Sequence, residues 1–415
     1  MRCSMQEIFR EHFPAYAQGH RLHAREQRAG HCISNCYTAA MGAHVLACPE
    51  GHYERVQYHA CGHRSCPRCA EESRQRWAQA QLAQLLPCPH VHVIFTLPHE
   101  FIALWAFNRA RINQLLFDCT RSSLLELLAE PRHLGAMPGL LMALHSWGRT
   151  LSHHPHVHCL VSAGGLDPQN QWRSCRKPSF FLPIKPLQHL FRGMFLAQLK
   201  QLLNEQRLSM PAAQDQQYWR SVIQSQYRAH WNVQICTPYE HGRGVALYLA
   251  RYVRGGPLPA DRALDLSHAP NGSTVSFGYI DHLDGRAKTL RLSASEFIAR
   301  ILWHAPPQGQ HTVRRAGLYA SALRGQHRLS RNLLQPAQPP QPMQALACHD
   351  LPIAPEPDRP RCPLCRSPLL RIARPSSSHH LGEIHIPSGH ASLPLGPTLR
   401  SSGQSIGFAD RPPLT

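Results

Sequence analysis

The order of apolar and polar positions along the chain predicts that helices and strands alternate. Residues 70–86 place apolar side chains at helical spacing, and Pro87 marks the end of this amphipathic helix. The apolar, β-branched runs 90–97 and 156–164 are typical of buried strands. We expect further helices within 5–30, 101–129, 186–207 and 244–253, a strand within 226–237, and a hairpin from 274–281 and 288–292. This alternation predicts an α+β or α/β domain from about residue 88 to residue 305.

Composition divides the rest of the chain. Residues 32–69 are rich in Cys, His and Gly and have no long periodic segment, as expected where a metal ion replaces a hydrophobic core. Sixteen of the 36 prolines follow position 335, a composition typical of disorder. The predicted units are a zinc-binding domain (1–87), the α+β domain (88–305), an extension with a zinc knuckle (306–370) and a disordered tail (371–415).

Charge narrows the class of partner. Among the 415 residues, 44 Lys and Arg exceed 25 Asp and Glu, which gives a net charge of +19. No run approaches the roughly 20 apolar residues that a membrane-spanning helix needs, which argues against a membrane protein. The positive charge favours a polyanionic partner, most simply nucleic acid. Because the N-terminus lacks the apolar segment of a signal peptide, we expect a cytosolic protein whose 15 cysteines are thiols.

Cysteine spacing predicts structural zinc. Cys66 and Cys69 form a Cys-x-x-Cys knuckle whose two thiolates can turn toward one ion. The nearest further ligands are Cys48, His52 and Cys61, with Cys32, Cys36 and His44 as alternatives. Later in the chain a second zinc site is predicted at Cys348, Cys362 and Cys365, to be completed by His349 or His304. Buried free thiols are the competing interpretation of the first group.

Two His-x-His pairs fall on expected strands. Alternate strand residues share one face of a sheet, so His156 and His158 direct two imidazoles toward one point. Such a pair suits a divalent ion, although a lone pair of this kind is more often structural or exposed. His90 and His92 have the same spacing, and spacing alone does not distinguish the two pairs.

Tyr248 and Tyr252 are four residues apart on an expected helix, so their phenols share one face. Aromatic residues at this spacing more often pack in a core. Arg251 and Arg254 beside them favour contact with phosphate. A divalent ion bound by two histidines would polarise a phosphodiester, which a tyrosine could attack to form a phosphotyrosine link to DNA.

Together these segments resemble the two-tyrosine rolling-circle transposases of the insertion sequence 91 type. The resemblance spans about residues 5–335 and includes CGHRSCPRC (61–69), HVIFTLPHE (92–100), ALHSWGRTLSHHPHVHCLVSAGGL (143–166) and YLARYVRG (248–255). It implies an N-terminal zinc-binding domain and an HUH nuclease domain over 88–305. The implied fold is α+β, with helices that flank a five-stranded antiparallel sheet. It also implies that the metal pair is His156 and His158 on a central strand.

The resemblance implies a transposase that nicks and transfers single-stranded DNA at insertion-element ends. Tyr248 and Tyr252 would be the nucleophiles, through 5′-phosphotyrosine intermediates, with Mg²⁺ or Mn²⁺ as the catalytic ion and Zn²⁺ as the structural ion. The partners would be single-stranded element ends and target DNA in the bacterial cytosol or nucleoid, without a membrane. The sequence predicts neither the oligomeric state nor the order in which the tyrosines act.

Two features depart from the family pattern. Gly51 and His52 stand where the family has a Cys-Gly pair. The third polar ligand that is usual at the catalytic ion has three candidates, namely His153, Glu100 and Glu240. The sequence leaves two other functions open: a non-catalytic zinc-dependent DNA-binding protein, and a relaxase or replication initiator with the same chemistry.

Overall fold

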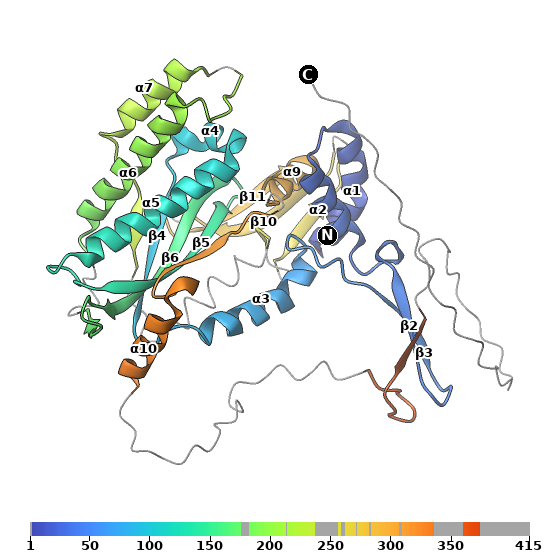
Figure 1. Ribbon diagram of the computed structural model, residues 1–415. Helices are drawn as coiled ribbons and strands as arrows, with labels where there is room; N and C mark the ends of the chain where they lie inside the picture. The colour runs from blue at the N-terminus through green and yellow to red at the C-terminus, as the bar shows by residue number, and fades with distance from the viewer. Residues whose placement is uncertain are drawn as a thin grey trace, which may run out of the picture. The chain divides into compact units, whose positions relative to one another are not determined.

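The computed structural model describes residues 2–175, 182–212, 214–236, 256–258, 262–270, 272–281, 284–306, 309–335 and 360–373. Within these residues the chain forms three antiparallel sheets, and helices pack against two of them (Figure 1). This arrangement confirms the predicted α+β class. The helix expected over 244–253 and the part of the predicted tail beyond Ala373 lie outside the described residues.

The largest sheet has the strand order β12, β5, β6, β4, β8, and β7 pairs with β6. Its strands are β4 (His90–Thr96), β5 (Met137–Trp147), β6 (His153–Leu166), β7 (Trp172–Ser174), β8 (Val233–Ile235) and β12 (Val313–Gly317). All of these pairings are antiparallel. The sheet therefore has six strands, one more than the resemblance implied, and β6 lies in the middle of the five-strand path.

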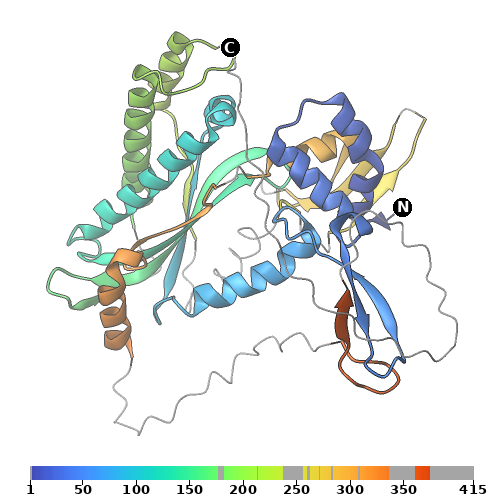
Figure 2. The same cartoon turned by 45° about the vertical axis from the view of Figure 1, so that its right-hand side comes forward.

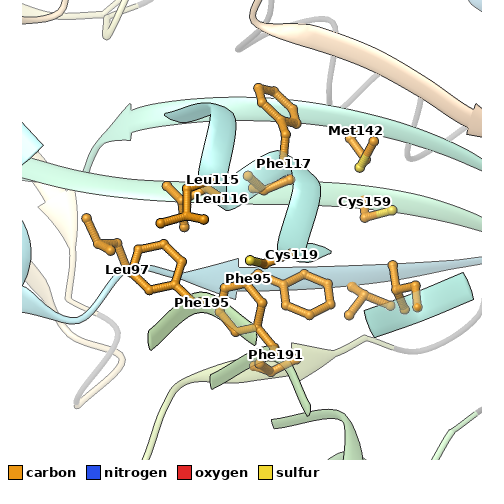
Figure 3. Close-up of a cluster of buried hydrophobic side chains, with 14 of the residues drawn as sticks. Phe95, Leu97, Leu115, Leu116, Phe117, Cys119, Met142, Cys159, Phe191 and Phe195 are labelled. Atoms are coloured by element: carbon orange, nitrogen blue, oxygen red, sulfur yellow. The ribbon is translucent and has the colours of Figure 1, made fainter. Parts of the chain in front are cut away.

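Helices cover one face of this sheet. They are α4 (Ile102–Phe107), which follows the 3-10 helix η2 (His99–Phe101), then α5 (Arg109–Ala129), α6 (Ile184–Asn204) and α7 (Gln216–Gln226). Val93 and Phe95 of β4 and Val157 of β6 are fully buried in the core shared with these helices. Figure 3 shows Phe95 beside Phe191 and Phe195 of α6, and the rings of Phe95 and Phe191 are 4.9 Å apart. Since successive strand residues alternate between faces, the intervening positions of β4 and β6 point to the opposite side.

The opposite face is covered in part by α3 (Pro67–Leu82). Trp77 of α3 belongs to a second apolar cluster, with Leu141 of β5, Leu160 of β6 and Tyr319. Tyr319 lies between β12 and a short C-terminal helical segment, made of the 3-10 helix η4 (Ser321–Leu323) and α10 (Arg324–Leu334). The strands β4, β5 and β6 are thus largely buried on both faces, and histidines interrupt their otherwise mostly apolar sequences.

A second sheet contains strands from both the predicted zinc-binding domain (1–87) and the predicted α+β domain (88–305). It contains β1 (Arg2–Cys3), β9 (Leu264–Ser267), β10 (Thr274–Ile280) and β11 (Ala287–Ser293). The helices α1 (Met5–Gly19) and α2 (Ala24–Asn35) share one apolar core with this sheet and with α9 (Ala294–Trp303). Phe9 of α1 and Phe297 of α9 are fully buried in that core. The predicted division at residue 87 therefore does not separate two cores.

The third sheet joins distant segments of the chain. Its order is β13 (Leu370–Ala373), β2 (Ala43–Ala47), β3 (Glu54–Tyr58), and the 3-10 helix η1 (Ala39–Met41) precedes β2. Figure 2 shows β13, drawn in dark red, beside the blue β2–β3 hairpin. The register pairs Leu370 with Ala47 and Arg371 with Leu46. The predicted start of the disordered tail at residue 371 is corrected by this pairing, because residues 371–373 form a strand.

Most elements with a clear local pattern are confirmed, including β4, β6, α5, α6 and the β10–β11 hairpin. Gly285 supplies the left-handed backbone (φ 68°) in the turn of that hairpin. Within the range 226–237, where a strand was expected, β8 covers only Val233–Ile235, and α7 extends to Gln226. The strand β5 was not expected from the sequence. Among the residues that the structure describes, no helix has the length and apolarity to cross a membrane.

Candidate functional site

A cluster of histidines lies on the sheet face opposite helices α5 and α6. His156 and His158 are alternate residues of β6, and strand pairing places His145 of β5 directly opposite His156. One ring nitrogen from each of the three lies within 4.8 Å of the others. The ring centroids are 4.2 Å apart for His145 and His158 and 4.7 Å apart for His156 and His158. Three imidazoles from two adjacent strands therefore meet at one point.

Burial keeps these imidazoles neutral at pH 7. It lowers the pKa of His156 to about 4, and it lowers the pKa values of His145 and His158 well below the ordinary value. Neutral imidazole is the form that binds a metal ion. Nδ1–H of His156 donates to the backbone carbonyl of His154 at 2.5 Å, so Nε2 keeps its lone pair. The ring nitrogens of the three histidines therefore lie close together in uncharged rings, and this set of donor atoms fits a divalent ion.

His145 is the third imidazole, and the sequence interpretation missed it. His153 is instead stacked on Trp303, with ring centroids 4.9 Å apart, and Glu100 lies in η2, outside the cluster. The structure therefore brings neither residue into the cluster, while Glu240 lies outside the described residues. The apolar run that leads to His145 was the available signal, because it is the strand β5.

The second His-x-His pair supports the sheet and the cluster. Nδ1–H of His90 donates to the carbonyl of Cys88 at 2.8 Å, so its Nε2 accepts from the hydroxyl of Tyr319 at 2.6 Å. His92 forms a hydrogen bond with the cluster, since its Nε2 lies 2.8 Å from Nδ1 of His158. His90 is thus a satisfied core residue, whereas His92 orients a member of the cluster from the neighbouring strand.

The residues predicted to act on phosphate lie beyond the described part of the chain. Tyr248, Tyr252, Arg251 and Arg254 all fall there. Arg64, in contrast, is described, and its charge contributes to the lowered pKa of His145. Its guanidinium donates to Oγ1 of Thr312 at 3.4 Å. A cation near the imidazoles is suited to a phosphate group.

Four cysteines gather where α2 ends and α3 begins. The Sγ atoms of Cys36, Cys61, Cys66 and Cys69 lie within 4.8 Å of one another. The distance from Sγ of Cys69 is 3.4 Å to that of Cys36 and 3.6 Å to that of Cys61. Cys36 is the C-cap of α2 and Cys66 is the N-cap of α3, so two helix ends position two of the thiols. Four thiolates in this arrangement fit a tetrahedral Zn²⁺ ion.

The structure corrects the predicted zinc ligands. Cys48 and His52 do not join Cys61, Cys66 and Cys69, because they lie in the loop between β2 and β3. Cys36, one of the alternatives that the sequence offered, completes that set. The second cluster consists of Cys48, His52, Cys362 and Cys365. His304 is not part of it, since its ring bonds to Ser146 and to the carbonyl of Leu151. Cys348 and His349 lie outside the described residues.

Comparisons with known proteins agree with this organisation. A family model described as "Transposase zinc-binding domain" matches residues 8–97, and one described as "Putative transposase" matches residues 139–327. The chain is 36% identical over 327 residues to "Putative transposase y4qJ" of Sinorhizobium fredii, which covers 77% of this chain and 81% of the relative. It is 30% identical over 295 residues to the transposase for insertion sequence element IS801 of Pseudomonas savastanoi pv. phaseolicola. This similarity covers 70% of this chain and 70% of the relative. No solved structure matches the chain. The chain belongs to the transposase family of the insertion sequence 91 type.

Proposed function

We propose that this transposase nicks single-stranded DNA at element ends and transfers it through 5′-phosphotyrosine intermediates, as in rolling-circle transposition. The observation that carries the proposal is the cluster of His145, His156 and His158 on the central strands of the sheet. Tyr248 and Tyr252 are the proposed nucleophiles. Their spacing of four residues would place both phenols on one face of a helix.

The chemistry needs help from an ion because the ordinary pKa of tyrosine is near 10, so the phenol is a poor nucleophile at pH 7. A divalent ion on the imidazoles would polarise the scissile phosphodiester and stabilise its developing charge. The tyrosine oxygen bonds to phosphorus, the bond to the 3′ oxygen breaks, and that oxygen takes up a proton. A 3′ hydroxyl can later reverse this step on another strand, since the phosphotyrosine keeps an activated ester. Two tyrosines permit two exchanges without release of an end.

The donor set bears on which ion is used. Mg²⁺ prefers oxygen ligands and near-octahedral geometry. Transition ions bind imidazole more strongly, and their affinity for a given site increases from Mn²⁺ onward in the series. A site with three imidazoles therefore favours Mn²⁺ over Mg²⁺. We propose Mn²⁺ as the better of the two ions that the sequence suggested.

The test uses single-stranded oligonucleotides that carry an element end, labelled on the 3′ side of the expected nick. With Mn²⁺, the wild-type chain should form an adduct that survives a denaturing gel, because the tyrosine keeps the 5′ phosphate. Tyr248→Phe with Tyr252→Phe should abolish the adduct while DNA binding remains. Tyr218→Phe is the matched control, since Tyr218 is an exposed tyrosine of α7. An unchanged nick in the double variant would overturn the proposal.

The same assay separates the alternative functions. A non-catalytic DNA-binding protein would bind the oligonucleotide without forming an adduct under any metal condition. A relaxase or replication initiator would form the adduct at a plasmid origin and not at an element end. The positive charge of +19 is compatible with all three, so only the substrate and the adduct decide between them.

A further inference from the structure

The second cluster is assembled from the two ends of the described chain. Cys48 and His52 lie in the loop between β2 and β3, whereas Cys362 and Cys365 precede β13, which pairs with β2. Sγ of Cys48 is 3.4 Å from Sγ of Cys365 and 3.9 Å from Nδ1 of His52. One donor atom from each of the four side chains lies within 4.8 Å of the others.

Each half of the cluster has the backbone of a metal-binding knuckle. In the first, N–H of Gly51 donates to the carbonyl of Cys48 at 3.0 Å, and Gly51 is left-handed with φ 72°. In the second, N–H of Arg366 donates to the carbonyl of Cys362 at 2.9 Å, and Arg366 is left-handed with φ 65°. Such turns direct two ligands of a short segment toward the same point. A left-handed arginine is costly, which indicates that the turn serves a purpose.

The apolar core around this cluster is too small to hold the segment in place. It comprises four buried residues, Leu46, Cys48, Cys362 and Leu369, and two of these are ligand candidates. The pairing of β13 with β2 is short and interrupted by an irregularity between Arg371 and Ala373. Small modules with so little core are usually held by a metal ion or by disulfides. A sulfur separation of 3.4 Å is far from the roughly 2.05 Å of a disulfide and close to the roughly 3.8 Å edge of a tetrahedral zinc–thiolate site.

We propose that Cys48, His52, Cys362 and Cys365 bind one Zn²⁺ ion that fastens residues 360–373 to the β2–β3 hairpin. The donor set of three sulfurs and one nitrogen is typical of structural zinc. This site is separate from the four-cysteine cluster, so the chain holds two structural zinc ions. The inference is independent of the proposed nicking chemistry, since it concerns ligands that the nuclease reaction does not use.

The zinc content of the full-length chain tests the proposal. Cys362→Ser combined with Cys365→Ser should lower the zinc content by one equivalent per chain relative to wild type, measured by mass spectrometry of the metal. Cys175→Ser is the matched control, because Cys175 is a partly buried thiol outside both clusters, and it should keep the full zinc content. A double variant that retains as much zinc as wild type would overturn the proposal.

Cobalt spectroscopy tests the same ligands in a chain that keeps all four positions filled. With Co²⁺ in place of zinc, His52→Cys should increase the thiolate-to-metal absorption, because the site would change from three sulfurs to four. The wild-type spectrum should show tetrahedral coordination at both sites, and an unchanged spectrum in His52→Cys would contradict the role of His52. Neither measurement depends on DNA cleavage, so a chain that fails to nick DNA can still bind two zinc ions.

Discussion

Replacement of His92 by alanine tests whether the sheet orients its metal ligands from the neighbouring strand. His92 and His158 are buried and joined by a hydrogen bond of 2.8 Å. Loss of such a supporting partner typically weakens metal binding by about 10- to 100-fold. This corresponds to about 1.4–2.7 kcal/mol of binding free energy. We therefore expect His92→Ala to bind Mn²⁺ about 10- to 100-fold more weakly, and His92→Gln to recover part of the loss, because an amide can also form the hydrogen bond.

The assay is a titration with Mn²⁺ followed by electron paramagnetic resonance, which distinguishes free from bound ion. His90→Ala is the matched control, because it removes an imidazole of the same strand that bonds to Tyr319 and not to the cluster. It should lower the free energy of unfolding by about 1–3 kcal/mol through the lost buried hydrogen bond, and leave the Mn²⁺ affinity unchanged.

Two outcomes would refute the reasoning. If His92→Ala binds Mn²⁺ as tightly as wild type, His92 does not orient His158. If His90→Ala weakens Mn²⁺ binding as much as His92→Ala, the effect arises from general loss of stability and not from orientation of a ligand. Urea unfolding of both variants separates these cases, because the two substitutions remove buried imidazoles from one face of the same strand.

Three further predictions follow from burial. His145→Ala should reduce Mn²⁺ binding and adduct formation more than His92→Ala does, because it removes a donor atom. Equal effects of the two substitutions in a metal titration would contradict the place of His145 in the cluster. Burial lowers the pKa of His90 to about 4 and that of His304 to about 3. The unfolded chain therefore takes up protons that the folded chain excludes. The free energy of unfolding should fall as pH drops from about 6.5 toward 4, by up to about 1.4 kcal/mol per pH unit for each histidine. Urea unfolding near pH 7 and pH 5 measures this slope, and a flat profile would refute it. Phe195→Ala should cost about 3–5 kcal/mol of unfolding free energy, because its ring is fully buried beside Trp231; a loss below about 1 kcal/mol in the same urea assay would contradict this packing.

Local patterns in the sequence were enough to predict the strands that carry His90, His92, His156 and His158. Each of these strands has an apolar run whose length and flanking residues identify it without knowledge of its neighbours. The helices α5 and α6 were identified in the same way. The distinction between the two histidine pairs, however, came from the family resemblance, since both pairs have the same spacing.

His145 and the grouping of the cysteines could not be predicted because they depend on pairing between distant segments. His145 joins the cluster only through the register of β5 and β6, in which it lies opposite His156. Cys36 replaces Cys48 at the first zinc cluster because the end of α2 meets the start of α3. Cys365 meets Cys48 across 317 positions of sequence, which no spacing rule anticipates. Motif spacing thus finds candidate ligands within one segment but does not show which distant segments meet at one site.

The two kinds of cluster use their surroundings in opposite ways. The sheet that carries His145, His156 and His158 has an extensive core with α5 and α6, so its fold does not need an ion. The cluster at Cys48 has only a small core, so an ion must supply what packing does not. Removal of metal by a chelator should therefore release residues 360–373 from the β2–β3 hairpin while the central sheet stays folded. Hydrogen exchange should show early loss of protection at β2 and no loss at β6. The thiolate site stabilises the fold around it, whereas the packed central sheet holds the three imidazoles in place without an ion.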